Sequence, residues 1–188
     1  NERKEPVYDK VPHNNDMVEK IINEGVEDNQ SVFSTSQGID ILKAYGIPFP
    51  DSILAENKAD ALNACKRIGF PVVLKIDSPD IQHKSEKGLV FTNLNNDKDV
   101  SDAYDKILYN YKKFKDKTMF GVNVVKQVRG HELVIGINKD VSFGHVLSIG
   151  FGGIFVEIYK DVAQTMLPAS KNEILELLKR TKFSKILE

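Results

Sequence analysis

Apolar residues recur along this chain with two different spacings, and the spacing changes from segment to segment. Residues three or four positions apart predict helices near residues 16–24, 34–45, 57–68, 96–115 and 170–178. Alternation with a period of two, or short apolar runs, predicts strands near residues 53–55, 72–76, 89–94, 119–126, 132–138, 145–150 and 162–167. Helix and strand pairs come first and mainly strands follow, which predicts an α+β fold with two lobes.

Capping residues and glycines mark the ends of the predicted helices. Ser34 and Gln37 have the spacing of a capping box, and Gly25 and Gly46 are placed to end the first two helices. A second capping box is predicted at Ser170 and Glu173, and Gly69 is placed to end the third helix. On the second helix, the residues predicted to face inward are Ile41, Leu42 and Tyr45.

The segment from Phe70 to Val90 joins a buried strand to a polar loop. Lys75 lies in an otherwise apolar strand, where a charge is costly to bury, so we expect its side chain to point into a polar cleft. Pro79 ends the strand, and His83 lies in the loop that follows, between residues with amine and hydroxyl groups. Such a loop favours phosphate chemistry, although a strand lysine that reaches solvent and an ordinary surface histidine fit the same pattern.

Composition narrows the class of protein. The chain has 188 residues, 41% of them apolar and 28% charged, with a net charge of -1, which argues against a nucleic-acid binder that relies on bulk positive charge. The single cysteine, Cys65, excludes an internal disulfide and fits a reducing, cytoplasmic location. No apolar run approaches the roughly 20 residues that span a bilayer. Residues 1–15 are polar and contain two prolines, so we interpret them as a linker or an ordinary chain terminus, and the missing initial methionine indicates a piece of a longer protein.

Two blocks of the sequence carry a family resemblance. Residues 75–88, KIDSPDIQHKSEKG, resemble the phosphohistidine loop of ADP-forming acyl-CoA synthetases, and residues 130–168 resemble a second block of the same family. The similarity extends from about Met17 to the end. It implies an ATP-grasp fold over residues 16–188 that is incomplete at its C-terminal end. Family members continue into an acidic E-x-D-x-N-P motif that binds magnesium, so the metal ligands of this chain stay unassigned.

The resemblance also implies roles for particular residues. His83 corresponds to the histidine that carries a phosphoryl group, and Lys75 to the strand lysine that contacts nucleotide phosphates. The remaining implied residues are an adenine-reading hinge at Lys126, Gln127 and Val128; a nucleotide-binding Glu132; and a phosphate or phosphohistidine docking turn with Gly150, Gly152, Gly153, Glu157 and Asp161. The chain departs from the family pattern at Leu89, where a glycine is common, at His131, where an arginine is usual, and at Gln164 and Thr165.

The resemblance implies an activity in which acyl-CoA, phosphate and ADP are interconverted with the free acid, CoA and ATP. Its cofactors are then ATP or ADP with Mg2+, and its partner is a CoA-binding (alpha) portion that handles the acid and CoA, with no nucleic acid and no membrane involved. The alternative is a non-catalytic, synthetase-like regulatory module of a protein acetyltransferase. Retention of His83 favours the enzyme.

Overall fold

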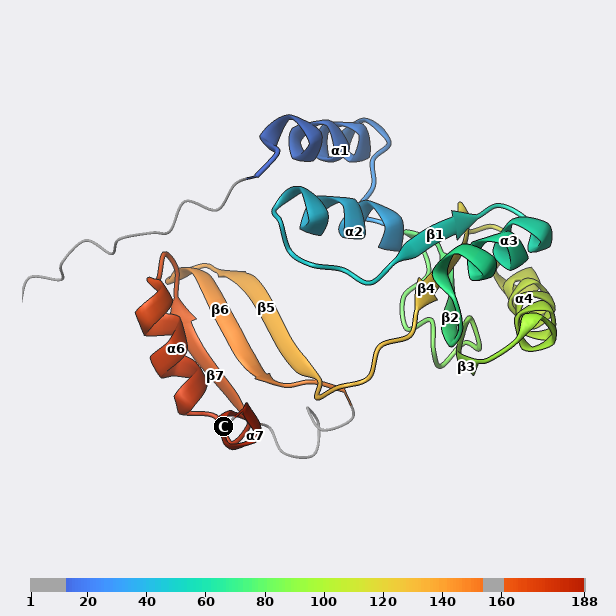
Figure 1. The fold of residues 1–188 in the computed structure, drawn as a ribbon. Helices are drawn as coiled ribbons and strands as arrows, with labels where there is room; N and C mark the ends of the chain where they lie inside the picture. The colour runs from blue at the N-terminus through green and yellow to red at the C-terminus, as the bar shows by residue number, and fades with distance from the viewer. Residues whose placement is uncertain (1–12, 154–160, 188) are drawn as a thin grey trace, which may run out of the picture. The chain divides into compact units, whose positions relative to one another are not determined.

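The protein forms two compact units that divide between Val128 and Arg129. The structure, a computed structural model, describes residues 13–153 and 161–187. Figure 1 labels the helices and strands of both units. Each unit has its own sheet, which fits the predicted α+β class with two lobes.

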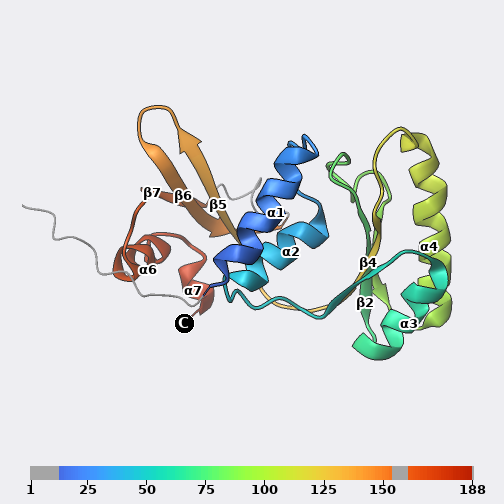
Figure 2. The same ribbon diagram turned by 90° about the horizontal axis from the view of Figure 1, so that it is seen from above.

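The first unit is organised around a four-stranded antiparallel sheet with the order β1-β4-β2-β3. Helices α3 and α4 cover one face of this sheet (Figure 2). The elements are β1 (Ser52–Ala55), α3 (Lys58–Ile68), β2 (Val72–Asp77), β3 (Val90–Leu94), α4 (Asp97–Tyr111), the 3-10 turn η1 (Lys112–Phe114) and β4 (Gly121–Lys126).

The alternating pattern of β2 sorts its side chains between the two faces of this sheet. Val72, Leu74 and Ile76 are fully buried and belong to the core that α3 and α4 share. Lys75 and Asp77 point to the opposite face because successive strand side chains alternate. This confirms the predicted period of two. It also places a lysine and a carboxylate on the face that α3 and α4 leave open.

Helices α1 (Asn15–Glu27) and α2 (Thr35–Ala44) form a hairpin at the start of the first unit (Figure 1). Asn14 caps α1, so the helix begins at the end of the segment that the sequence predicted to be a linker. The prediction that Gly25 ends this helix is wrong. Gly25 is buried inside α1, and a Cβ there would lie 2.7 Å from the ring of Phe33, so the glycine allows close packing.

The capping box at Ser34 and Gln37 is confirmed, as is the end of α2 before Gly46. The predicted inward stripe of α2 is wrong, since Leu42 and Tyr45 are exposed and Ile39 is the buried residue. The helix is short and contacts few neighbours. The side that becomes buried is therefore set by where its N-terminus attaches, which spacing alone does not show.

The second unit contains a three-stranded antiparallel sheet with the order β5-β6-β7, and α6 packs against one face of it (Figure 1). Its elements are β5 (Leu133–Asp140), β6 (Gly144–Phe151), β7 (Val162–Met166), α6 (Lys171–Lys179) and α7 (Ser184–Leu187). The capping box at Ser170 and Glu173 is confirmed. The core cluster among its described residues is small, with Leu147, Ile149 and Leu177 as the buried members, and Phe183 is buried outside this cluster against Phe151. The short extended piece predicted after Gly153 lies outside the described residues.

None of the helices in the described part of the chain is both long enough and apolar enough to span a lipid bilayer.

Candidate functional site

Lys75 and His83 line the same cavity of about 200 Å³ in the first unit. Lys75 enters it from β2, and His83 enters from the loop between β2 and β3. The apolar part of the lining comes from Val32, Pro79, Ile81 and Val90. The structure therefore brings together the strand lysine and the loop histidine that the sequence selected separately.

The backbone presents the His83 imidazole to solvent. His83 has a φ of 51°, which is the left-handed region, and its side chain is 69% exposed. A compact turn follows, closed by the bonds from Leu89 N to Lys84 O (2.9 Å) and from Gly88 N to Ser85 O (3.1 Å). Left-handed backbone at a non-glycine residue costs roughly 1–2 kcal/mol, and this turn holds His83 there.

Glu86 and Lys87 add side-chain contacts to this loop. Glu86 Oε1 lies 3.4 Å from His83 Nδ1, and Lys87 Nζ donates to the carbonyl of Gln82 at 2.6 Å. A carboxylate beside Nδ1 favours the tautomer that keeps the proton on that nitrogen. In that tautomer Nε2 carries the lone pair.

The cavity concentrates positive charge. Lys75 and Lys84 both line it, and neither ammonium group makes a hydrogen bond or an ion pair with the described residues. Burial lowers the pKa of the Lys84 ammonium below its usual range, and the charge of Lys75 lowers this pKa further, while Asp77 acts in the opposite direction. Two partly buried cations without a bonded carboxylate among the described residues favour the approach of an anion.

Asp77 fixes helix α2 to the end of β2. Its buried carboxylate accepts hydrogen bonds from the backbone N–H of Thr35 (2.8 Å) and of Ser36 (3.3 Å), and from the Ser36 hydroxyl. A carboxylate at a helix N-terminus satisfies amides that have no partner within the helix and interacts favourably with the helix dipole. Asp77 therefore holds α2 next to the strand that carries Lys75.

The predicted adenine hinge is largely engaged within the protein. Lys126 Nζ donates to the carbonyls of Gly69 (3.1 Å) and Phe70 (2.7 Å), while the backbone amides of Lys126 and Gln127 donate to the carbonyls of Asp51 and Pro71. The Gln127 side chain pairs with Asn93. Neither backbone N–H is therefore available to read an adenine edge in this state. Val128, by contrast, is 68% exposed.

In the second unit, Glu132 and the glycine turn after β6 lie together. Gly152 N donates to Glu132 O at 2.7 Å, and a Cβ on Gly153 would lie 2.1 Å from Glu132 Oε2. Gly153 also has a φ of 60°, a left-handed conformation that favours glycine there.

Gly150 packs against the backbone of Asp161, where a Cβ would lie 2.1 Å from its carbonyl oxygen. The Asp161 carboxylate accepts from Phe183 N at 3.1 Å. The structure thus unites Gly150, Gly152 and Gly153 with Glu132 and Asp161, whereas Glu157 lies outside the described residues. These residues and the cavity of Lys75 and His83 belong to different units.

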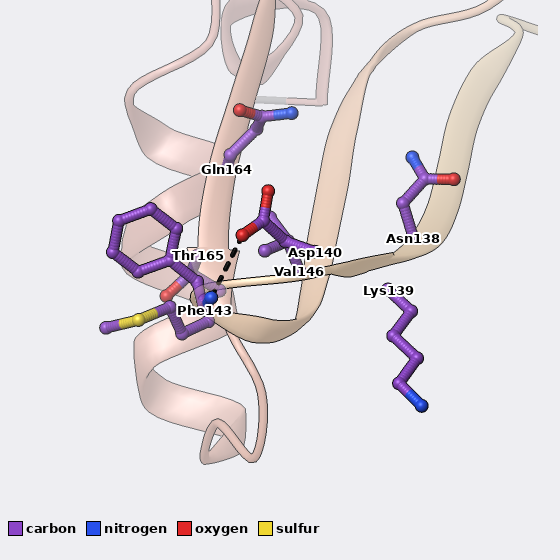
Figure 3. A pocket seen from close by; sticks show the side chains of 8 residues that line it. Asn138, Lys139, Asp140, Phe143, Val146, Gln164 and Thr165 are labelled. Carbon is purple, nitrogen blue, oxygen red and sulfur yellow. Dashed lines mark hydrogen bonds between the residues drawn. The ribbon is translucent and has the colours of Figure 1, made fainter.

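A larger hollow of about 510 Å³ lies at the turn between β5 and β6 (Figure 3). Asp140 accepts there from the backbone N–H of Ser142 and Phe143, and Figure 3 shows Lys139 pointing away from the other polar side chains. These bonds lower the pKa of Asp140 and close the hairpin turn. Residues of the hairpin and of β7 line this hollow, and they include no group of catalytic side chains.

Sequence reasoning did not select Asp77 or Asn123 as site residues. Asn123 of β4 pairs directly with Lys75 of β2, and Asp77 lies two positions along β2 from Lys75. Both side chains therefore lie on the same face of the sheet as Lys75. A polar residue between Val122 and Val124 is a local signal, but only strand register shows which residue lies opposite it. Within residues 13–153 and 161–187, no group of three His, Cys, Asp or Glu side chains is arranged to hold a metal ion.

Similarity to known proteins identifies the family of this chain. The family model described as "ATP-grasp domain" matches residues 24–188. The chain is 34% identical over 170 residues to the beta subunit of ADP-forming acetate–CoA ligase II of Pyrococcus furiosus, covering 89% of this chain and 72% of that subunit. The chain belongs to the ATP-grasp family of ADP-forming acid–CoA ligases.

Other members of this ligase family are longer. The chain is 41% identical over 177 residues to the ADP-forming 4-hydroxybutyrate–CoA ligase of Nitrosopumilus maritimus. This alignment covers 93% of this chain and 25% of that protein. It spans 65% of the beta subunit of acetate–CoA ligase I of Pyrococcus furiosus, with 40% identity. The chain therefore corresponds to one portion of these ligases.

Solved structures share the fold of this chain. A crystal structure from Pyrococcus horikoshii aligns with a TM-score of 0.86 and 35% identity, covering 92% of this chain and 74% of that one. The dinucleotide-forming acetyl-coenzyme A synthetase 1 of Ca. Korarchaeum cryptofilum aligns with a TM-score of 0.77 and 31% identity, covering 90% of this chain and 75% of that one. That structure contains a phosphorylated phosphohistidine segment, and another of the same enzyme, with a TM-score of 0.75, 31% identity and coverage of 90% and 73%, contains Mg-AMPPCP.

Proposed function

We propose that this chain is the nucleotide-side portion of an ADP-forming acid–CoA ligase and that His83 carries a phosphoryl group to ADP. The observation that carries the proposal is the cavity that His83 shares with Lys75 and Lys84, two ammonium groups without an anionic partner in the described residues. The loop that holds His83 is the one whose sequence resembles the family's phosphohistidine loop. A phosphoryl group on His83 would supply the missing negative charge.

The transfer uses the Nε2 atom of His83. With Glu86 beside Nδ1, the Nε2 lone pair forms a bond to phosphorus while the bond from phosphorus to the donor breaks. The donor is a phosphohistidine of the CoA-binding portion, whose imidazole leaves with its electron pair. A terminal phosphate oxygen of ADP then attacks the same phosphorus, the P–N bond breaks, and ATP forms.

Lys75 and Lys84 provide the electrostatic part of this reaction. Their ammonium groups neutralise charge on the transferred phosphoryl group and on the nucleotide phosphates, which is the main contribution a protein makes to phosphoryl transfer. Thr35 and Ser36 hold Asp77 by hydrogen bonds, so its carboxylate is compensated and does not compete fully with the incoming anion.

The remaining predicted residues act in nucleotide and phosphohistidine binding in this proposal. Val128 and the chain beside it contact the adenine, with Lys126 and Gln127 supporting the hinge through the bonds described above, and Glu132 contacts the nucleotide. The turn formed by Gly150, Gly152 and Gly153, with Glu157 and Asp161, docks phosphate or phosphohistidine. ATP or ADP binds with Mg2+, which neutralises phosphate charge when bound, and its protein ligands are not assigned to the described residues.

The complete ligase converts acyl-CoA, phosphate and ADP into the acid, CoA and ATP. A CoA-binding portion, fused or separate, forms the acyl phosphate and handles the acid and CoA. The proteins compared above support this assignment, since they are named as ligases or beta subunits of ligases. They give no support to the alternative, a regulatory module of a protein acetyltransferase.

Phosphorylation of the complete enzyme tests the proposal. Incubation with ATP labelled in its terminal phosphate should leave an acid-labile, base-stable phosphoryl group on His83, attached through Nε2. The His83→Asn variant keeps a similar size but has no nucleophilic ring nitrogen. It should lose both the label and ATP synthesis, while acyl-phosphate formation at the CoA-binding portion continues.

The matched control is His145→Asn, which changes an exposed histidine of β6 in the other unit. This variant should keep full labelling and turnover. Near-normal ATP synthesis by His83→Asn would show that His83 does not carry the phosphoryl group.

A further inference from the structure

The Asn123 amide nitrogen is a buried donor without an acceptor. Asn123 is 1% exposed, and its Nδ2 atom makes no hydrogen bond within the described part of the chain. Buried polar atoms in folded proteins are almost always hydrogen-bonded, so an orphan donor indicates a partner that the chain itself does not supply. The candidates are a ligand and a bound water molecule.

Strand register places this donor beside Lys75. Asn123 of β4 is paired directly with Lys75 of β2, and the two side chains therefore point to the same face of the sheet. Directly opposite residues in an antiparallel pair have Cβ atoms about 4.5–5.5 Å apart. On its other side Asn123 is paired with Leu54 of β1, which offers no acceptor from its side chain.

The charges on this face favour an anion as the missing partner. Lys75 and the neighbouring Lys84 are cations without a bonded carboxylate in the described residues. The carboxylate of Asp77, two positions along β2 from Lys75, accepts from Thr35 and Ser36 instead. Lys75 lines the cavity and Asn123 does not, so strand pairing with Lys75 is what places the unsatisfied amide donor next to a cation of the cavity.

We propose that Asn123 donates a hydrogen bond from Nδ2 to a phosphate oxygen bound by Lys75, as a further ligand-binding residue of this site. This inference rests on the proposed function, and it adds a residue from β4 to the groups contributed by β2 and the His83 loop. Because the amide is shielded from water, its bond to an anion is stronger than the same bond at the surface. The phosphate belongs either to the nucleotide or to phosphorylated His83.

Two substitutions in the complete enzyme separate ligand binding from a structural role. Asn123→Leu removes the donor at similar size, and Asn123→Asp places a carboxylate opposite Lys75. We expect Asn123→Leu to weaken the binding of ADP, or to shorten the lifetime of phosphorylated His83, by roughly tenfold. Asn123→Asp should have a larger effect because it also pairs with Lys75 and repels the anion.

Two measurements identify which phosphate Asn123 binds. Calorimetric titration with ADP in a His83→Asn background reports the nucleotide alone, since no phosphohistidine forms there. The decay of labelled His83 after removal of nucleotide reports the phosphoryl group alone. Weakening in the first measurement assigns Asn123 to the nucleotide, and faster decay in the second assigns it to phosphohistidine.

A stability measurement tests the alternative that Asn123 donates only to a bound water molecule. Asn123→Leu removes an unsatisfied buried donor, so the ligand-free enzyme should melt at the same or a higher temperature while it binds phosphate less well. The control Asn63→Leu changes an exposed amide on α3 and should alter neither property. A higher melting temperature with unchanged ADP affinity and unchanged decay would show a bound water only and overturn the inference. If His83→Asn keeps its label, the proposed function fails whatever Asn123 does.

Discussion

At the scale of single residues, the most informative feature of the site is the pair of lysines that face one cavity. Burial and the Lys75 charge both lower the pKa of Lys84, so keeping Lys84 protonated costs stability in the folded state. For a base whose pKa is lower in the folded state, the unfolded chain binds more protons between the two pKa values. Stability therefore rises with pH across that window.

Replacing Lys84 with methionine should stabilise the ligand-free protein at neutral pH and weaken its binding of phosphate. The gain in melting temperature should shrink as pH rises through the lowered pKa towards the usual value of lysine, because Lys84 itself becomes neutral there. Thermal unfolding at several pH values, with ADP titration at pH 7, measures both effects. Lys113→Met, at an exposed position of η1, is the control, and a lower melting temperature for Lys84→Met would contradict the charge argument.

Cys65 should be inert in the folded protein. It is fully buried in the core between the sheet and α3, and burial raises the pKa of its thiol to about 11, with a smaller contribution from the charge of Asp97. Since the thiolate is the reactive species, a maleimide at pH 8 should label Cys65 only after denaturation. A Ser142→Cys variant, which adds an exposed thiol on the β5–β6 hairpin, should label rapidly without denaturant. Fast labelling of native Cys65 would show that this core opens.

At the scale of elements, the attachment of α2 to β2 depends on one carboxylate. Asp77 is buried, and its carboxylate joins β2 to α2 by a bond from Thr35, which lies 42 positions earlier in the chain. Few other bonds of this kind hold the α1–α2 hairpin to the sheet within the described residues. The hairpin should therefore be sensitive to changes at this single position.

Asp77→Asn should destabilise the first unit by about 1–3 kcal/mol, because the amide is neutral and turns an NH2 group towards donors that need an acceptor. Hydrogen exchange should accelerate most in α2 (Thr35–Ala44), and Ser36→Ala should show part of the effect. Denaturant unfolding and exchange measured by mass spectrometry test this. Asp40→Asn, an exposed acid on the same helix, should change neither, and equal effects of both variants would contradict the role of Asp77.

At the scale of the whole molecule, the two units have cores of very different size. Sixteen buried residues form the hydrophobic core of the first unit, whereas three form that of the second among the described residues. Burial of apolar surface is the main source of stability, so local opening should be easier in the second unit.

Backbone amides of β2 and β4 should exchange at least ten times more slowly than those of β5, β6 and β7. Hydrogen exchange of the chain without nucleotide, read peptide by peptide, measures this difference. The internal amides of each strand should be compared, because terminal residues fray in both units. Uniform protection across both sheets would show that the small core of the second unit is reinforced by contacts beyond those described.

Features that depend on neighbours within a few residues could be predicted from the sequence. These are the two capping boxes, the period of two in β2, the stop at Gly69 and the loop that presents His83. A capping bond spans three residues and a strand alternates every two, so the local sequence contains the complete signal. Local sequence led to a wrong prediction for Gly25, which is set by packing against Phe33. It also led to a wrong prediction for the buried side of α2, which depends on attachment to Asp77.

The sets of distant residues that share a site depend on the folded chain and could not be predicted from the sequence. The pairing of Lys75 with Asn123, the bonds from Ser36 to Asp77 and the approach of Glu132 to Gly153 all join segments that are separate in sequence. Register between strands is set by how whole faces pack and by where turns lie, and a shift of one residue would turn Asn123 away from Lys75. The composition of β4 shows that Asn123 is unusual, but the fold alone gives it a cationic neighbour and leaves its donor without a partner.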